Sequence, residues 1–185
     1  LAFVGSRRPS SYGLRMARSL AREAAKAVAV VSGLARGIDT QAHEAALEAG
    51  GVTWAVLGSG LLKFYPPENE ALGRRIVESG GCLISEYPLF TAPLPEFFPR
   101  RNRIVSGLSW ATVVVEGQAK SGSLITARLA LEQGREVLAV PGPADSPSSQ
   151  APHLLISQGA KLACSMEDIW PELPAGVRLA ARGNR

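Results

Sequence analysis

Four short glycine- and serine-rich segments contain the residues of this sequence best suited to bind a ligand. They are residues 5–7, 32–37, 58–60 and 121–123. Glycine lets the backbone approach a ligand closely, serine hydroxyls donate hydrogen bonds, and the N–H groups at the start of a helix favour anions. One such segment could simply be a turn, but this set, in which basic residues also occur, predicts a phosphate-binding site.

Basic side chains indicate which kind of phosphate the site would hold. The chain has 20 lysines and arginines against 16 acidic residues, and its net charge is +4. This mild excess is compatible with an anionic partner. The positions of the basic residues are more informative than the net charge. Arg7 and Arg8 form one basic cluster, and Arg100, Arg101 and Arg103 form another.

A cradle that includes Arg36, Lys120, Arg101 and Arg103 suits an extended polyanion better than a single nucleotide. The sequence has no Walker lysine pattern, and no G-x-G-x-x-G fingerprint follows its first predicted strand. Both motifs hold the phosphates of nucleotide cofactors. A dinucleotide is therefore disfavoured, and we expect no cofactor.

Enzyme chemistry finds little support among the titratable residues. His43 and His153 are the only histidines, and Asp39 stands four residues before His43. This pair could be an acid/base couple or two metal ligands, but a helix cap and a hydrogen-bonded structural histidine are the commoner arrangement. Ser32 and Ser121 have no histidine that the sequence can nominate as a base. We therefore assign no catalytic residue.

Aromatic side chains stand beside several of the predicted loops. They are Tyr65, Tyr87, Phe97 and Phe98. They could pack on the core or cover the site, or they could stack on nucleic-acid bases. Both interpretations stay open on the sequence alone.

The elements that position these residues follow an alternating pattern. Continuous apolar runs predict strands covered on both faces, at residues 1–4, 28–31, 53–57, 82–85, 111–116 and 136–140. Helices are predicted between them, around residues 14–28, 39–49, 68–79, 99–108 and 124–131. We expect Asp39 to be an N-cap and Pro99 to lie in a first helical turn.

This alternation predicts an α/β fold with a doubly wound, mostly parallel sheet and helices on both of its faces. In such a sheet the loops at the carboxyl ends of the strands bind ligands. We expect the segments 32–36, 58–60 and 121–123 to meet at one edge.

Length and composition place these elements in one domain. A chain of 185 residues suits a single core. We assign residues 1–170 to it and interpret residues 171–185, rich in proline, glycine and arginine, as a linker or tail. The chain opens without methionine, directly in a predicted strand, so we expect it to be part of a longer protein.

The environment is expected to be the reducing cytoplasm. Cys82 and Cys164 are isolated thiols without the spacing of a zinc site or a disulfide framework. No apolar run approaches the roughly 18 residues that a membrane span needs, and no signal peptide opens the chain. We expect no metal and no membrane.

An ordered set of segments resembles the DNA-processing protein A family of bacterial natural transformation (DprA, also called Smf). The segments are residues 4–7 (Val-Gly-Ser-Arg), 32–39 (Ser-Gly-Leu-Ala-Arg-Gly-Ile-Asp), 85–88 (Ser-Glu-Tyr-Pro), 98–103 (Phe-Pro-Arg-Arg-Asn-Arg), 121–124 (Ser-Gly-Ser-Leu), 141–142 (Pro-Gly) and 159–160 (Gly-Ala). No single segment is decisive, but together they span nearly all of residues 1–165.

The resemblance implies a Rossmann-like core that forms a homodimer and binds single-stranded DNA with little sequence preference. It also implies protection of incoming DNA and help in loading the RecA recombinase. The implied DNA-binding residues are Gly5, Ser6, Arg7, Ser32, Gly33, Arg36, Arg101, Asn102, Arg103, Lys120, Ser121, Gly122 and Ser123. Asn102 and one of the arginines could instead pin a helix to the sheet, and the structural residues are Asp39, His43 and Thr126.

Two other classes of protein compete with this interpretation. Nucleotide phosphoribohydrolases of similar fold carry Pro-Gly-Gly-x-Gly-Thr-x-x-Glu, and Thr126 stands where their catalytic glutamate would be. Without that carboxylate we expect no enzyme activity. The other alternative is a carrier of a small phosphorylated ligand.

Overall fold

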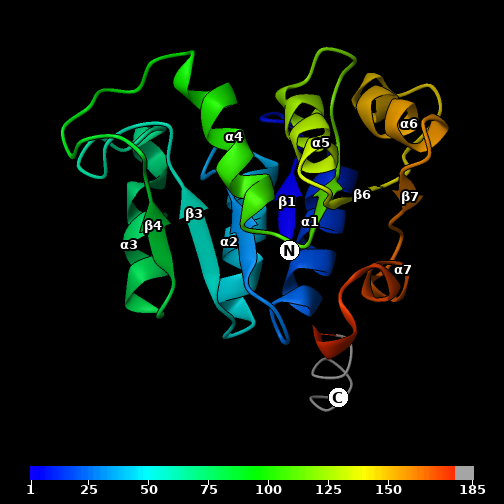
Figure 1. The fold of residues 1–185 in the computed structure, drawn as a ribbon, viewed down its shortest axis with the longest axis horizontal. Helices are drawn as coiled ribbons and strands as arrows, with labels where there is room; N and C mark the ends of the chain where they lie inside the picture. The colour runs from blue at the N-terminus through cyan, green and yellow to red at the C-terminus, as the bar shows by residue number, and fades with distance from the viewer. Residues whose placement is uncertain (178–185) are drawn as a thin grey trace.

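Seven strands form one sheet, in the spatial order β4-β3-β2-β1-β5-β6-β7 (Figure 1). The computed structural model describes residues 1–177. All neighbouring strands are parallel. The strands are β1 (Ala2–Val4), β2 (Val30–Ser32), β3 (Thr53–Val56), β4 (Cys82–Ile84), β5 (Ala111–Val114), β6 (Glu136–Ala139) and β7 (Lys161–Leu162).

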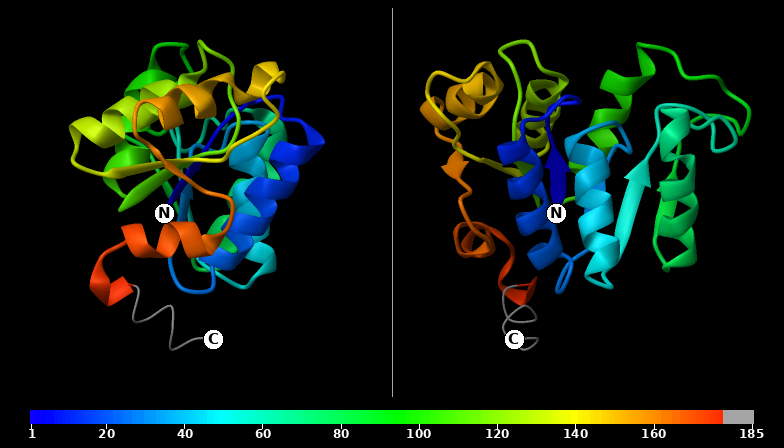
Figure 2. Two further views of the ribbon diagram at one scale, coloured as in Figure 1. Left: turned by 90° about the vertical axis from the view of Figure 1, so that its right-hand side faces the viewer. Right: turned by 180° about the vertical axis from the view of Figure 1, so that it is seen from behind.

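Helices cover both faces of the sheet (Figure 2). The helices are α1 (Ser11–Ala24), α2 (Ile38–Glu48), α3 (Glu70–Glu78), α4 (Phe97–Gly107), α5 (Gly122–Glu132), α6 (Gln150–Ser157) and α7 (Met166–Ile169). Short 3-10 turns are η1 (Pro67–Asn69), η2 (Pro147–Ser149) and η3 (Trp170–Glu172). Helices α1, α2 and α7 share one hydrophobic cluster, and α4, α5 and α6 share another on the opposite face.

Strand side chains alternate between these two clusters. In β1, Phe3 packs into the cluster under α1 and α2, whereas Ala2 and Val4 belong to the cluster under α4 and α5. Both sets are apolar because a central parallel strand has no solvent face. This is why the strands are continuous apolar runs in the sequence.

The order of the strands places the ligand-binding edge. From β1 the chain builds the sheet through β2, β3 and β4, and from β5 it builds the other half through β6 and β7. Ligands of such sheets bind at the carboxyl ends of the strands, close to the point where the strand order reverses, here between β1 and β5. The loops after β1, β2, β3 and β5 lie along that edge, at the top of Figure 1.

Six predicted strands and the predicted helices on both faces are confirmed. The seventh strand, β7, was missed because it has only two residues, both exposed, and therefore no apolar pattern. The predicted N-cap is wrong. Gly37 takes that position with a φ of 79°, and Asp39 lies in the first turn of α2. Pro99 lies in the first turn of α4, which begins at Phe97.

The packed part of the chain extends beyond the predicted boundary at residue 170. Residues 170–172 form η3, and Leu173 is buried in the cluster under α1 and α2. The last eight residues of the predicted tail, 178–185, lie outside the described residues. Within residues 1–177, no helix combines the length and the apolar character needed to cross a membrane.

His43 is a structural residue of this core. Its Nδ1 atom lies 2.6 Å from the Thr53 hydroxyl, which donates its own proton to the Val30 carbonyl at 2.8 Å. Nδ1 must therefore carry a proton and donate it to Thr53. Burial, together with the charge of Arg101, lowers the pKa of His43 to about 3. The alternative in which His43 acts as an acid, a base or a metal ligand finds no support here.

The stability of the fold should consequently decrease as the pH falls from about 6.5 toward 3. In that window the unfolded chain binds a proton at His43 that the folded chain excludes. Between pH 7 and pH 5 this difference in proton binding should lower the free energy of unfolding by roughly 2 kcal/mol. The substitution His43→Gln should remove this decrease. Urea unfolding at the two pH values measures the difference. His153→Gln, which changes a partly exposed histidine, is the matched control, and an equal effect of both substitutions would contradict the assignment.

Candidate functional site

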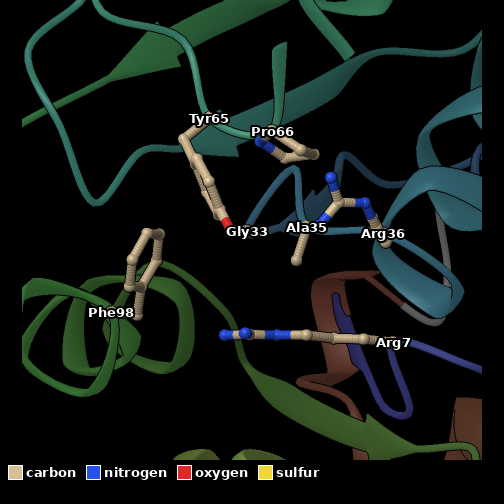
Figure 3. Close-up of a pocket in the computed structure, with 7 residues that line it drawn as sticks. All are labelled: Arg7, Gly33, Ala35, Arg36, Tyr65, Pro66 and Phe98. Atoms are coloured by element: carbon tan, nitrogen blue, oxygen red, sulfur yellow. The ribbon is translucent and has the colours of Figure 1, made fainter. Parts of the chain in front are cut away.

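A small pocket opens at the carboxyl edge of the sheet, where three loops converge. Figure 3 shows the residues that line it: Arg7, Gly33, Ala35, Arg36, Tyr65, Pro66 and Phe98. The pocket encloses about 270 Å³ including its open mouth.

The β2–α2 loop provides the floor of the pocket. Leu34 has a φ of 58° and Gly37 a φ of 79°, both in the left-handed region. A Cβ atom on Gly37 would lie 2.3 Å from the Ser6 carbonyl oxygen, so only glycine fits. The carboxylate of Asp39 accepts hydrogen bonds from the backbone N–H groups of Gly33 (3.1 Å) and Ala35 (3.3 Å). Asp39 therefore holds the loop in its turned conformation.

Arg101 holds the same loop from the other side. This side chain is only 4% exposed, and its guanidinium donates to the carbonyl oxygens of Gly33 (2.5 Å) and Val56. A Cβ atom on Gly33 would lie 2.5 Å from Arg101 Nη2, so a side chain there would displace the guanidinium group. The backbone of Gly33 is thus hydrogen-bonded to an anion through its N–H and to a cation through its carbonyl oxygen.

Burial shifts the pKa of both charged groups. It raises the pKa of Asp39, while the charge of Arg101 and the backbone N–H donors act in the opposite direction. It lowers the pKa of Arg101 to about 10, and the charge of Asp39 limits that decrease. The two groups therefore support each other's charged form inside the protein.

The loop after β1 brings Arg7 to the pocket. Its end is anchored by Glu116, a buried carboxylate just beyond β5 that accepts from the Ser10 backbone N–H (2.8 Å) and hydroxyl (2.5 Å). The Ser10 hydroxyl in turn caps α1 by accepting from the Gly13 N–H at 3.1 Å. Glu116 was not among the predicted site residues, because an acidic residue at the end of an apolar run gives no sign that it will be buried.

Two aromatic rings form one wall of the pocket. The centroids of Tyr65 and Phe98 are 5.3 Å apart in a tilted arrangement. The Arg7 guanidinium lies 5.6 Å from the Phe98 ring, and the Arg36 guanidinium lies 5.9 Å from the Tyr65 ring. Both distances suit cation–π attraction. The position of the Phe98 ring depends on Gly58, because a Cβ atom on residue 58 would lie 2.9 Å from that ring.

Acidic residues accompany two of the predicted DNA-binding arginines. Arg36 pairs with Glu68, and Arg103 pairs with Glu86. All four side chains are exposed for a third or more of their surface. These carboxylates were not predicted either, because their positions beside the arginines depend on how separate loops fold together.

The α5 loop lies farther along the same edge. Lys120 and Gly122 are exposed, whereas the Ser121 and Ser123 hydroxyls bond each other at 2.8 Å. The end of β5 lies two strands from the end of β2, a separation of roughly 10 Å at normal strand spacing. A strand of DNA could span that gap, but this loop does not line the pocket of Figure 3.

The structure therefore brings only part of the predicted set together. Arg7, Gly33 and Arg36 line the pocket, and Gly5 and Ser6 precede Arg7 in the same loop. Two of the predicted DNA-binding side chains are bonded within the protein. The Ser32 hydroxyl is fully buried and donates to the Phe3 carbonyl at 2.6 Å.

The second is Arg101, which is buried and bonded to backbone carbonyl oxygens. It performs the alternative role, pinning α4 to the sheet. Its neighbour Asn102 accepts a hydrogen bond from Arg101 Nε at 3.3 Å. Within residues 1–177, no three histidine, cysteine or acidic side chains are grouped so that they could hold a metal ion.

Comparison with known proteins gives a family and a fold. The family model described as DNA recombination-mediator protein A matches residues 1–174. Protein Smf of Escherichia coli is 52% identical over 178 residues, which are 96% of this chain and 48% of that protein. The chain thus spans about half the length of the curated relatives that it matches.

Two solved structures have the same Rossmann-like architecture. DNA processing protein A from Streptococcus pneumoniae superimposes with a TM-score of 0.87 at 43% identity, over 94% of this chain and 61% of that one. DNA processing protein A from Helicobacter pylori superimposes with a TM-score of 0.83 at 31% identity, over 91% of this chain and 76% of that one. The latter structure is described as showing a unique single-stranded DNA binding mode.

Arg101→Met should destabilise the fold by roughly 3–5 kcal/mol, because it leaves the Asp39 charge buried without its compensating cation. Arg100→Met is the matched control. Its side chain is exposed, so the change should stay within about 0.5 kcal/mol. Urea unfolding of the two variants measures this. Adding Asp39→Asn to Arg101→Met should recover part of the loss, and equal costs for Arg100→Met and Arg101→Met would contradict the role of Arg101.

Proposed function

This chain belongs to the DNA recombination-mediator protein A family, and from that membership we propose that it binds single-stranded DNA through its phosphates. The observation that carries the proposal is the convergence of Arg7 and Arg36 on one pocket (Figure 3). Arginine guanidinium groups recognise phosphate oxygens through charge-assisted hydrogen bonds. Arg7 comes from the loop after β1 and Arg36 from the loop after β2, so the parallel sheet brings the two side chains together.

The shape of the site favours an unpaired strand. Narrow loops at the edge of a sheet can follow a flexible chain of phosphates but cannot easily surround a duplex. Tyr65 and Phe98 offer aromatic surface beside the arginines, and aromatic rings stack on exposed bases with little regard to their identity. Contacts to phosphates carry no sequence information. Binding should therefore be largely indifferent to base order.

We propose that the strand continues from the pocket toward Lys120 and the start of α5. Both regions lie at the same sheet edge (Figure 1). Arg103 would add a further contact once its pair with Glu86 opens. These assignments extend the pocket into a track long enough for several phosphates.

The wider role proposed for the chain follows the family. We propose a cytoplasmic homodimer that protects incoming DNA and helps to load the RecA recombinase. A dimer would present two pockets to one strand and gain from effective concentration. A monomer in light scattering at micromolar concentration would contradict the dimer, and unchanged RecA filament formation on DNA coated by a single-strand-binding protein would contradict the loading role.

We propose binding without a catalytic step. Thr126, which stands where hydrolases of similar fold carry a glutamate, is buried and directs its hydroxyl to the Gly122 carbonyl of its own helix at 3.5 Å. It supplies no carboxylate for attack on a ribosyl bond. Release of free base from thymidine monophosphate, lost in Thr126→Val, would contradict this.

The salt dependence of DNA binding tests the phosphate contacts. Each phosphate neutralised on a single strand contributes a slope of roughly −0.7 to log K against log salt. Arg36→Ala and Lys120→Ala should each flatten the slope by about that amount, and equally for unrelated sequences. Fluorescence anisotropy with labelled oligonucleotides over a range of salt concentrations provides the measurement.

Arg74→Ala is the matched control, because Arg74 pairs with Glu70 along α3 and does not line the pocket. It should leave the slope unchanged. Tighter binding of duplex than of single strand would refute the proposal. A small phosphorylated ligand that binds more tightly than a strand would favour a carrier instead.

A further inference from the structure

Glu68 forms an ion pair with Arg36, one of the two arginines that line the pocket. The Nε atom of Arg36 pairs with a carboxylate oxygen of Glu68. The two side chains are 49% and 52% exposed, so the pair is open to solvent and to a ligand. No ion pair of residues 1–177 includes Arg7, the other arginine of the pocket.

The backbone fixes Glu68 beside Arg36. Glu68 lies in η1, whose last residue, Asn69, is buried. The Asn69 amide donates to the Leu34 carbonyl and to the Thr40 hydroxyl, both at 2.9 Å. These bonds attach η1 to the loop that carries Arg36. The glutamate is thus presented to the arginine by a rigid support, and only its side chain is free to turn away.

Carboxylates and phosphates use the same donors of a guanidinium group. While Glu68 holds Nε of Arg36, a phosphate cannot take the bidentate position that includes this atom. From this geometry we infer that Glu68 is an intramolecular competitor of the DNA phosphate for Arg36, and that it lowers the affinity of the pocket for any phosphate ligand. The inference rests on the function proposed above.

Competition of this kind lowers the affinity for a strand and for a free nucleotide by the same factor, but a strand has other contacts to offset the loss. A mononucleotide must displace Glu68 with its single phosphate. A strand that is held at other points along the sheet edge keeps its phosphates near Arg36 at high effective concentration. It displaces the carboxylate at concentrations where a free nucleotide does not. Glu68 therefore keeps the pocket available to DNA among the nucleotides of the cell.

Glu68→Asp separates competition from a general effect of charge. Aspartate keeps the negative charge but is one methylene shorter, so it withdraws the carboxylate from Arg36. Binding of a labelled thymidine 20-mer, measured by anisotropy, should become about two- to five-fold tighter, the range that an exposed ion pair accounts for. In an Arg36→Ala background the same substitution should change nothing. Glu70→Asp, which shortens a glutamate paired with Arg74 outside the pocket, should also change nothing.

Two results would overturn the inference. One is wild-type affinity in Glu68→Asp together with tighter binding in Glu68→Gln, which would show that Glu68 acts only through its charge. The other is an equal gain from Glu68→Asp with and without Arg36. A titration with thymidine monophosphate followed by ³¹P NMR needs no DNA, so it remains informative if the DNA proposal fails. Its affinity should rise by the same factor in Glu68→Asp, and an unchanged value would contradict the competition.

Discussion

The backbone of Gly33, which donates its N–H to Asp39 and accepts from Arg101 at its carbonyl oxygen, is the constraint on which the candidate site depends. Buried charges are costly unless their hydrogen bonds are satisfied. Here the partners are backbone groups of a loop that contains two left-handed residues, Leu34 and Gly37. One pair of side chains therefore joins α2, the β2–α2 loop and α4. Hydrogen bonds to buried side chains thus attach the floor of the pocket to the core beneath it.

The parallel sheet explains why residues far apart in the sequence converge on this floor. Every strand ends at the same edge, so Arg7, Arg36 and Tyr65 arrive from the loops after β1, β2 and β3, and Phe98 arrives from the first turn of α4. Close backbone approach completes the arrangement. Gly37 allows the loop after β2 to pack on the loop after β1, and Gly58 allows the Phe98 ring to cover the end of β3.

The arginines that looked alike in the sequence have three different environments. Arg101 is buried and structural, Arg36 and Arg103 are exposed but paired with glutamates, and Arg7 lies against the Phe98 ring. The positive charge available to a phosphate is therefore smaller than the count of arginines suggests. A phosphate must displace a glutamate before it can pair with Arg36 or Arg103. The mild net charge of +4 does not reveal this.

The sequence by itself determined the fold class, because apolar runs covered on both faces and helical stripes between them depend only on local periodicity. It also determined the glycine-rich loops and, through motif order, the family. It did not reveal β7, the burial of Glu116 and Ser32, or the pairing of Arg36 with Glu68. Only the tertiary structure decided which polar side chains face the ligand. A charged residue looks the same in the sequence whether its partner is water, a carbonyl or a carboxylate, and that partner comes from an element elsewhere in the chain.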